Sequence, residues 1–184
     1  MRSNMDSLKV FANMDKQLTS IFETFEELAS QVELEVVGDL KNEMIIREQV
    51  YPGIYLIEIK KSAEHSAFDQ WITWFKGEWD HERYAKKFVP TTKKKRISGH
   101  VELKEWMPVY LGKSKRIASR VIEHVHLELE KPTFAMKFGA RGDFFTSNTF
   151  RLSTAHIDIA HYDLIMPMVE RSLRRRLNPI VGKQ

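Results

Sequence analysis

The chain has no cysteine among its 184 residues. This absence excludes disulfide bridges, zinc sites built on thiolates and cysteine nucleophiles, and it suits a reducing cytosol. Long hydrophobic runs are also lacking, since no apolar stretch approaches the roughly 20 residues that span a bilayer. The first residues, Met-Arg-Ser-Asn-Met-Asp, do not form the apolar segment of a signal peptide. We therefore expect a cytoplasmic protein with no part in a membrane.

Several nucleotide-binding and nucleophile motifs are missing as well. There is no P-loop and no dinucleotide fingerprint, because the segment 139–142, Gly-Ala-Arg-Gly, lacks the required Lys-Ser/Thr. There is also no Gly-x-Ser-x-Gly elbow of an esterase-like enzyme. With these motifs excluded, the remaining candidates for a chemical role are charged and phenolic side chains.

Charge is unevenly distributed along the chain. The net charge is +4, but residues 1–50 hold five Lys/Arg against ten Asp/Glu, a balance of −5, so residues 51–184 carry +9. A basic body favours a polyanionic partner, nucleic acid first. With an apolar fraction of 42%, the length suits one domain with an appended element.

Residues 6–32 are expected to form one long helix that Asp6 or Ser7 caps. Its apolar residues follow the a and d positions of three heptads: Phe11, Met14, Leu18, Ile21, Phe25, Leu28 and Val32. Such a stripe is typical of a helix laid on its own domain. It is equally the pattern of a dimer seam, and the sequence leaves both open.

The rest of the chain alternates strand and helix signals. Residues 66–88 look helical, with Phe68, Trp71, Ile72 and Phe75 in the core and Gly77 as a break. The other expected elements are strand and loop at 32–50, strands at 53–59, 106–111, 133–138 and 149–159, a loop at 90–100, a helix from the cap Ser114 to Leu129, and a last helix at 163–177.

A basic stripe is expected on the helix after Ser114. Arg116, Arg120 and His124 recur every four residues and so share one side of a helix, beside its apolar face and not deeply buried. Three cations in a row suit a bound phosphate, which the free N–H groups of the helix start would also attract. A solvated basic face is the alternative interpretation.

Two tyrosines and one glutamate are further candidates. Tyr55 and Tyr110 lie on separate apolar strands, the usual position of core tyrosines. Glu170 lies near the edge of the buried face of the last helix, where an exposed ion pair with Arg174 is the plain interpretation. If a metal binds, we expect Mg²⁺ held by this one carboxylate, by water and by substrate phosphate.

Taken jointly, these residues resemble the GIY-YIG nuclease superfamily. Gly53-Ile54-Tyr55 looks like the first signature, and Tyr110-Leu111-Gly112 looks like the second, with Leu for the usual Ile. Arg120, His124 and Glu170 fall where the family has its helix Arg, the His one turn later and the metal-binding Glu. Leu177-Asn178-Pro179 resembles the closing motif, although Gly182 stands where the family often has a further Asn.

The resemblance implies an α+β fold, with a small mixed sheet of three strands flanked by helices. It covers residues 51–184 as a nuclease domain, preceded by an N-terminal helical element, 1–50, on the core or on a dimer partner. In the family a short hairpin joins the two signatures, whereas 54 residues separate Tyr55 from Tyr110 here. Residues 62–104 are therefore expected to be an insertion with a recognition role.

The resemblance also implies metal-dependent hydrolysis of a DNA phosphodiester. Tyr55, or water oriented by it, would start proton removal, for which Lys and Arg neighbours would have to favour the Tyr55 phenolate, and His124 could share or relay the proton. Arg120 would stabilise charge on the phosphate, and Tyr110 would orient the phosphate or water. Glu170 would hold one Mg²⁺, which Mn²⁺ could replace. Contacts to DNA are expected from Lys93, Lys94, Lys95, Arg96, Lys113, Arg116 and Asn178.

The expected protein is thus a Type II restriction endonuclease that cuts a short site in double-stranded DNA, with a homodimer as its candidate assembly. No linker-joined targeting domain, usual in homing and excision-repair members, is visible in the sequence. A structure-specific or repair nuclease is the first alternative. A catalytically silent DNA-binding module is the alternative of another class.

Overall fold

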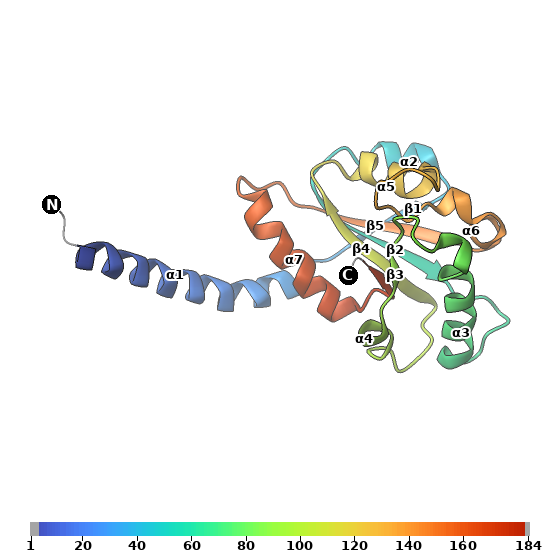
Figure 1. The fold of residues 1–184 in the computed structure, drawn as a ribbon, viewed down its shortest axis with the longest axis horizontal. Coiled ribbons are helices and arrows are strands. Elements are labelled where there is room, and N and C mark those ends of the chain that lie inside the picture. Colours follow the sequence, from blue (N-terminus) through green and yellow to red (C-terminus); the bar gives the residue numbers. More distant parts are fainter. Residues whose placement is uncertain (1–3, 183–184) are drawn as a thin grey trace.

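A computed structural model describes residues 4–182 of the chain, in which helices and strands alternate (Figure 1). The α-helices are α1 Asn4–Ser30, α2 Glu43–Arg47, α3 Phe68–Trp79, α4 Lys94–Ile97, α5 Ile117–His126, α6 Asp143–Ser147 and α7 Tyr162–Leu177. The strands are β1 Glu35–Asp39, β2 Gly53–Lys60, β3 Thr91–Thr92, β4 Trp106–Ser114, β5 Phe150–His156 and β6 Val181–Gly182. Two 3₁₀ turns, η1 Glu82–Tyr84 and η2 Phe138–Arg141, complete the described chain.

The fold is α+β, as expected, but the sheet differs from the prediction. Its four strands run in the order β1-β5-β2-β4, and every pair is antiparallel, so a mixed sheet of three strands is wrong. A second sheet joins β3 to β6. The fourth strand is β1, whose residues 35–39 precede the boundary expected at residue 50, so part of the N-terminal segment belongs to the main sheet.

Strand β2 lies inside the sheet and is buried at every position from Gly53 to Ile59. A nearly continuous apolar run is typical of a strand covered on both faces, and the one charged residue in it, Glu58, is paired with Arg151. On one face its side chains join a core with residues of α3, α5 and α6, and on the other they meet α7 and the end of α1. Figure 1 shows α7 on the opposite side of the sheet from α5.

A β-bulge in β4 lies next to one of the candidate tyrosines. Ile57 pairs with Tyr110 but Glu58 pairs with Pro108, so Val109 is an extra residue in β4. The bulge lets Val109 enter the same core cluster as Tyr110. Pairing is regular from Gly112 to Tyr110, so Tyr110 shares a sheet face with Tyr55, one step diagonally across the strand pair.

The strand expected at 133–138 is absent from the described chain, because its backbone is used otherwise. The Met136 N–H donates to the imidazole of His124 over 3.0 Å, which prevents a ladder hydrogen bond. The ammonium of Lys137 donates to the carbonyls of Lys87, Leu129 and Lys131. This segment therefore joins α5 to the loops that contain Lys87 and residues 129–131.

Three other local expectations were also wrong. Helix α3 continues through Gly77, where a Cβ would meet nothing within 4 Å, and ends at Trp79. The loop expected at 90–100 contains β3 and the short helix α4, and the strand and loop expected at 32–50 include α2. The core role of Trp71, Ile72 and Phe75 is confirmed, since all three are buried.

Helix α1 spans nearly the predicted range but lies on its own domain only at its C-terminal end. It begins at Asn4, before Asp6 and Ser7, so neither caps it. Only its last turns contact the body, where Phe25 joins the cluster on α7 and Ala29 is buried. The preceding turns project away from the body (Figure 1). Among the described residues, no helix is long and apolar enough to cross a membrane.

Candidate functional site

The two signature glycines make room for their neighbours. Gly112 pairs directly with Tyr55 across the two strands, and the Tyr55 ring lies over it. A Cβ at Gly112 would therefore lie 2.4 Å from the hydroxyl oxygen of Tyr55. A Cβ at Gly53 would lie 2.0 Å from the carbonyl oxygen of Ala155 in β5. Both positions therefore require glycine, and Tyr55 and Tyr110 come together with ring centroids 6.2 Å apart.

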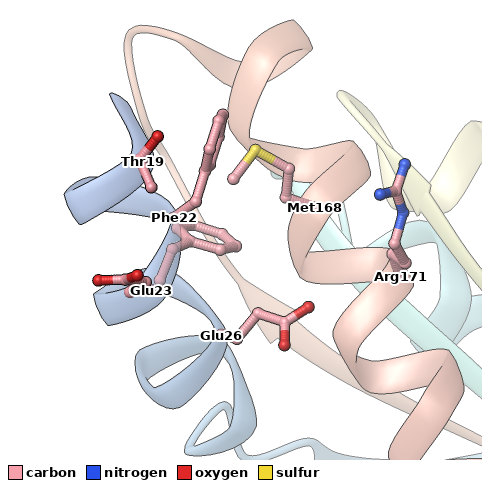
Figure 2. Close-up of a pocket in the computed structure, with 7 residues that line it drawn as sticks. Thr19, Phe22, Glu23, Glu26, Met168 and Arg171 are labelled. Atoms are coloured by element: carbon pink, nitrogen blue, oxygen red, sulfur yellow. The ribbon is translucent and has the colours of Figure 1, made fainter. Parts of the chain in front are cut away.

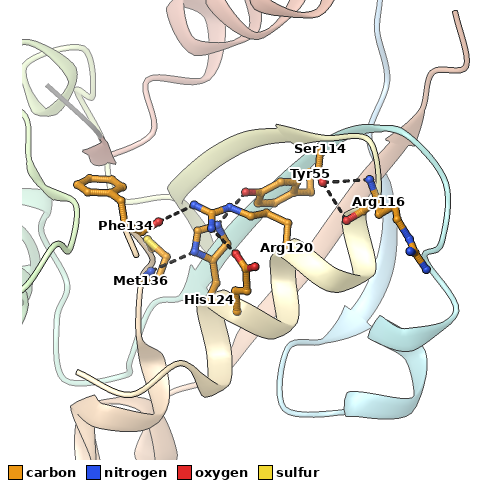
Figure 3. Close-up of polar contacts among 8 residues, drawn as sticks. Tyr55, Ser114, Arg116, Arg120, His124, Phe134 and Met136 are labelled. Carbon is orange, nitrogen blue, oxygen red and sulfur yellow. Dashed lines mark hydrogen bonds and ion pairs between the residues drawn. The ribbon is translucent and has the colours of Figure 1, made fainter. Parts of the chain in front are cut away.

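His124 reaches this pair from α5 and is fully buried (Figure 3), contrary to the expected half-exposed stripe. Its Nε2 lies 2.8 Å from the Tyr55 hydroxyl, and its Nδ1 accepts the Met136 N–H. Since a backbone N–H can only donate, Nδ1 carries no proton, and neutral His124 has its hydrogen on Nε2. His124 therefore donates to Tyr55 and cannot take its proton in this arrangement.

The charge states of this pair follow from burial. Burial, helped by the Arg120 guanidinium, holds the pKa of His124 well below its usual value. Burial also raises the pKa of Tyr55 well above 10.0, aided by Tyr110 and opposed by Arg120. Burial raises the pKa of Tyr110 too. Both phenols and the imidazole are thus neutral near pH 7, so the expected phenolate does not form in this state.

Arg120 lies one helical turn before His124, as predicted, at the open side of the tyrosines. Its Nη1 donates to Glu123 over 2.5 Å and its Nη2 to the carbonyl of Phe134 over 2.6 Å (Figure 3). These contacts hold the guanidinium in a fixed orientation. Its charge lowers the pKa of both Tyr55 and Tyr110, which means that it lies within electrostatic reach of each hydroxyl.

Glu170 contributes the one carboxylate of α7 near this group. Its Oε1 accepts from Arg174 Nη2 over 2.5 Å, and the pair is more buried than expected, with 12% of the Glu170 side chain exposed. Burial raises the pKa of the Glu170 carboxyl, while Arg174, Lys113 and Arg96 oppose the rise. The Glu170 carboxylate in turn contributes to the raised pKa values of Tyr55 and Tyr110.

Two further arginines complete the site. Arg174 appeared in the sequence only as an ion-pair partner, yet its charge acts on Tyr110, and its Nε is buried without a hydrogen-bond partner. Arg96, expected to contact DNA from a loop, lies half-buried on α4 and donates to the carbonyls of Pro179 and Val181. Burial lowers the pKa of Arg96, and the positive charge of Arg174 lowers it further. Tyr110 and Glu170 oppose this decrease.

The resulting cluster contains three guanidiniums around two neutral phenols, together with the carboxylates of Glu123 and Glu170, which leaves a local excess of positive charge. Such a cluster suits a phosphate, which guanidiniums bind bidentately. Among the described residues, no group of three His, Asp or Glu could hold a metal ion. Glu170 alone fits only a hydrated Mg²⁺ that shares its coordination with a phosphate ligand.

The start of α5 does not offer the phosphate site expected there. Ser114 belongs to β4 and accepts the N–H of Arg116, and α5 begins at Ile117. The first N–H groups of α5, from Ile117 and Ala118, already donate to carbonyls of Tyr51 and Gln49. Arg116 is exposed and non-helical, so the stripe of three cations does not form.

The other predicted contacts lie at different distances from this cluster. Lys94 and Lys95 are exposed on α4, and Lys93 bonds to Thr91. Lys113 is close enough to act on the pKa of Glu170. Asn178 ends α7 in the left-handed conformation and lines a separate hollow of about 150 Å³. It lies eight residues beyond Glu170, about 12 Å along the helix.

Comparison with models of known protein families, with curated proteins and with solved structures gave no match. The functional argument therefore depends on the geometry of this chain itself.

Proposed function

We propose that this chain is a Mg²⁺-dependent DNA endonuclease with a GIY-YIG-like core. The observation that carries the proposal is the convergence of five residues chosen from separate sequence motifs. These residues come from two strands and two helices: the rings of Tyr55, Tyr110 and His124 lie with centroids 5.1 to 6.2 Å apart, and the charges of Arg120 and Glu170 act on the pKa of both phenols. An unrelated fold would not be expected to gather these side chains around one pair of tyrosines.

In this proposal the phosphate of the scissile bond binds among the guanidiniums. Arg120, oriented by Glu123 and Phe134, faces the phenols and stabilises charge that develops on the phosphate. Tyr110 directs its hydroxyl at a phosphate oxygen. Arg96 and Arg174 add positive charge on the side of α7.

Tyr55 orients the attacking water in this mechanism. Its oxygen already accepts from His124 Nε2, and a hydrogen bond from Tyr55 lowers the pKa of Tyr110, so its hydroxyl hydrogen points to Tyr110 in this state and would turn to water when substrate binds. His124 serves as a positioning residue, locked in one tautomer by Met136. We thus assign His124 a role in orienting Tyr55 rather than in relaying a proton.

The ion pair of Glu170 and Arg174 would open when substrate binds. A phosphate is a second anion for Arg174, and drawing the guanidinium towards it would free the carboxylate. Glu170, desolvated and then without its cation, would hold Mg²⁺ together with water and the phosphate. The bound ion would stabilise the leaving 3′ oxygen.

The substrate in this proposal is duplex DNA, and the enzyme type is a restriction endonuclease. The exposed Lys94 and Lys95 lie on the same short helix as Arg96, so they extend its positive charge outward. A structure-specific nuclease would use the same site on branched DNA.

Digestion of supercoiled plasmid and of a mapped phage DNA tests the proposal. A restriction enzyme would give discrete bands with Mg²⁺ and none with EDTA. Cleavage of branched junctions alone would favour the structure-specific alternative. DNA binding without cleavage in Mg²⁺ or Mn²⁺ would favour the silent binding module and contradict the proposal.

A further inference from the structure

Helix α1 carries a long apolar stripe that the body covers only at one end. Its exposed large apolar side chains are Leu8, Val10, Phe11, Met14, Leu18, Ile21, Phe22 and Leu28. Phe11 remains 66% exposed and Ile21 57% exposed. A helix that keeps this much apolar surface in water normally has a partner in the functional state.

The free stripe continues the face of α1 that already packs on α7. With 3.6 residues per turn, Met14 and Leu18 lie within about 20° of Phe25 around the helix axis. Phe25 and Val32 pack against the α7 cluster. The contact surface therefore extends beyond the body in a straight line, and no described residue covers the extension.

An open cavity of about 540 Å³ lies where the covered and free parts meet (Figure 2). Phe22 of α1 and Met168 of α7 line it, together with Glu23, Glu26 and Arg171. Figure 2 shows Phe22 and Met168 pointing towards one another across the gap. The cavity thus extends the apolar stripe towards α7.

The charge of α1 argues against DNA as the partner. Asp6, Asp15, Glu23, Glu26 and Glu27 stand against Lys9 and Lys16, a balance of −3. A polyanion would be repelled by this helix.

The spacing of the stripe favours a second copy of the same helix. Apolar residues at a and d recur every 3.5 residues on average, which matches the seam of a left-handed coiled coil. In a parallel pair of the free turns the facing g and e′ positions are Val10 with Asp15 and Gln17 with Phe22, so no like charges meet. An antiparallel pair centred on the free turns would set Asp15 against its own copy.

The size of the stripe is sufficient for a stable interface. If each of the six exposed apolar side chains of the free turns, from Leu8 to Ile21, loses about 100 Å² on pairing, two helices bury about 1,200 Å² in total. Specific protein interfaces bury about this area.

We propose that the free turns of α1, residues 8–21, form a parallel two-stranded coiled coil with those of a second copy of this chain, and that the two helices diverge where α7 covers the same face of each. The two bodies then lie side by side at the same end of the coil, related by a two-fold axis. This assembly is independent of the proposed nuclease activity.

Analytical ultracentrifugation without DNA or metal tests the assembly by measuring the molecular mass in solution. The protein concentration should be about 10–50 µM, within the range of typical dimer affinities. The wild-type chain should have the mass of two copies. Met14→Asp with Leu18→Asp should reduce the mass to one copy. The matched control, Asn13→Asp with Ser20→Asp, adds the same charge on the opposite, exposed face of α1 and should remain a dimer. A monomeric wild-type protein, or a control variant that also loses the dimer, would refute the proposed coiled coil.

The absence of cysteine allows a second measurement that does not depend on the folding of the Asp variants. Met14→Cys should give a disulfide-linked dimer on oxidation, because d positions face each other in a parallel pair. Asn13→Cys should not. Efficient linkage through Asn13→Cys, or none through Met14→Cys, would contradict the arrangement, while the plasmid assay would still decide the nuclease proposal separately.

Discussion

The hydrogen bonds of His124 predict how the stability of the protein depends on pH. His124 is fully buried and accepts the Met136 N–H at Nδ1, so protonation of that nitrogen would break the bond. In the unfolded chain the imidazole titrates near 6.5. In the folded chain burial and Arg120 hold the pKa of His124 well below this value.

The sign follows from the number of protons that each state binds. Above pH 6.5 His124 is neutral in both states, and its contribution is fully present. As the pH falls below 6.5, the unfolded state takes up a proton that the folded state refuses. The free energy of unfolding should therefore decrease by up to about 1.4 kcal/mol per pH unit, until the folded pKa is reached.

Urea unfolding of the wild type and of His124→Gln between pH 4.5 and 8 measures this contribution. Glutamine does not titrate but has an oxygen for Met136 and an NH₂ for Tyr55. The difference between the two profiles should be flat above pH 6.5 and should shrink below it. Parallel profiles, or an imidazole that titrates near 6.5 by NMR in the folded protein, would refute the assigned tautomer and the positioning role.

Two further changes test the packing of the site and its DNA contacts. Gly112→Ala should cost about 1–3 kcal/mol of unfolding free energy and suppress cleavage, because its Cβ would strike Tyr55 and Tyr110. The matched Gly77→Ala, in open space within α3, should stabilise by about 0.5–1 kcal/mol; equal effects in urea titrations would contradict the close approach. Replacing Lys93, Lys94 and Lys95 together by Ala should reduce the salt slope of DNA binding by about 0.9 per lost phosphate contact. An unchanged slope would exclude these lysines from the DNA interface.

Much of the framework follows from local sequence patterns. The strand around Tyr55 and the core face of α3 carry their own periodicity, and both are confirmed. The segment 133–138 alternates like a strand. However, its Met136 N–H binds His124, 12 residues away, and its Lys137 ammonium binds the carbonyl of Lys87, 50 residues away. Such tertiary hydrogen bonds leave no periodic signal, so the sequence could not predict them.

The candidate site shows the same limit. The selection of Tyr55, Tyr110, Arg120 and Glu170 came from the family resemblance, because each of them alone has an ordinary structural interpretation, and their roles stay predictions. The burial of His124 depends on the loop that covers α5, and the approach of Arg96 depends on the antiparallel pairing of β3 with β6. For Arg174 the only local signal was its position four residues after Glu170.

The most direct test of the proposed nuclease compares Glu170→Gln with Glu58→Gln. Glu58 is buried and Glu170 is half-buried, and both are paired with arginine, since Glu170 lies 2.5 Å from Arg174 and Glu58 lies 2.6 Å from Arg151. The two variants should therefore lose similar stability. If Glu170 holds the metal, its variant should lose plasmid cleavage by orders of magnitude while it still binds DNA, since charge at a metal supplies several kcal/mol to the reaction. Glu58→Gln should cleave at nearly the wild-type rate, and a folded Glu170→Gln protein that does the same in Mg²⁺ would contradict the proposed site.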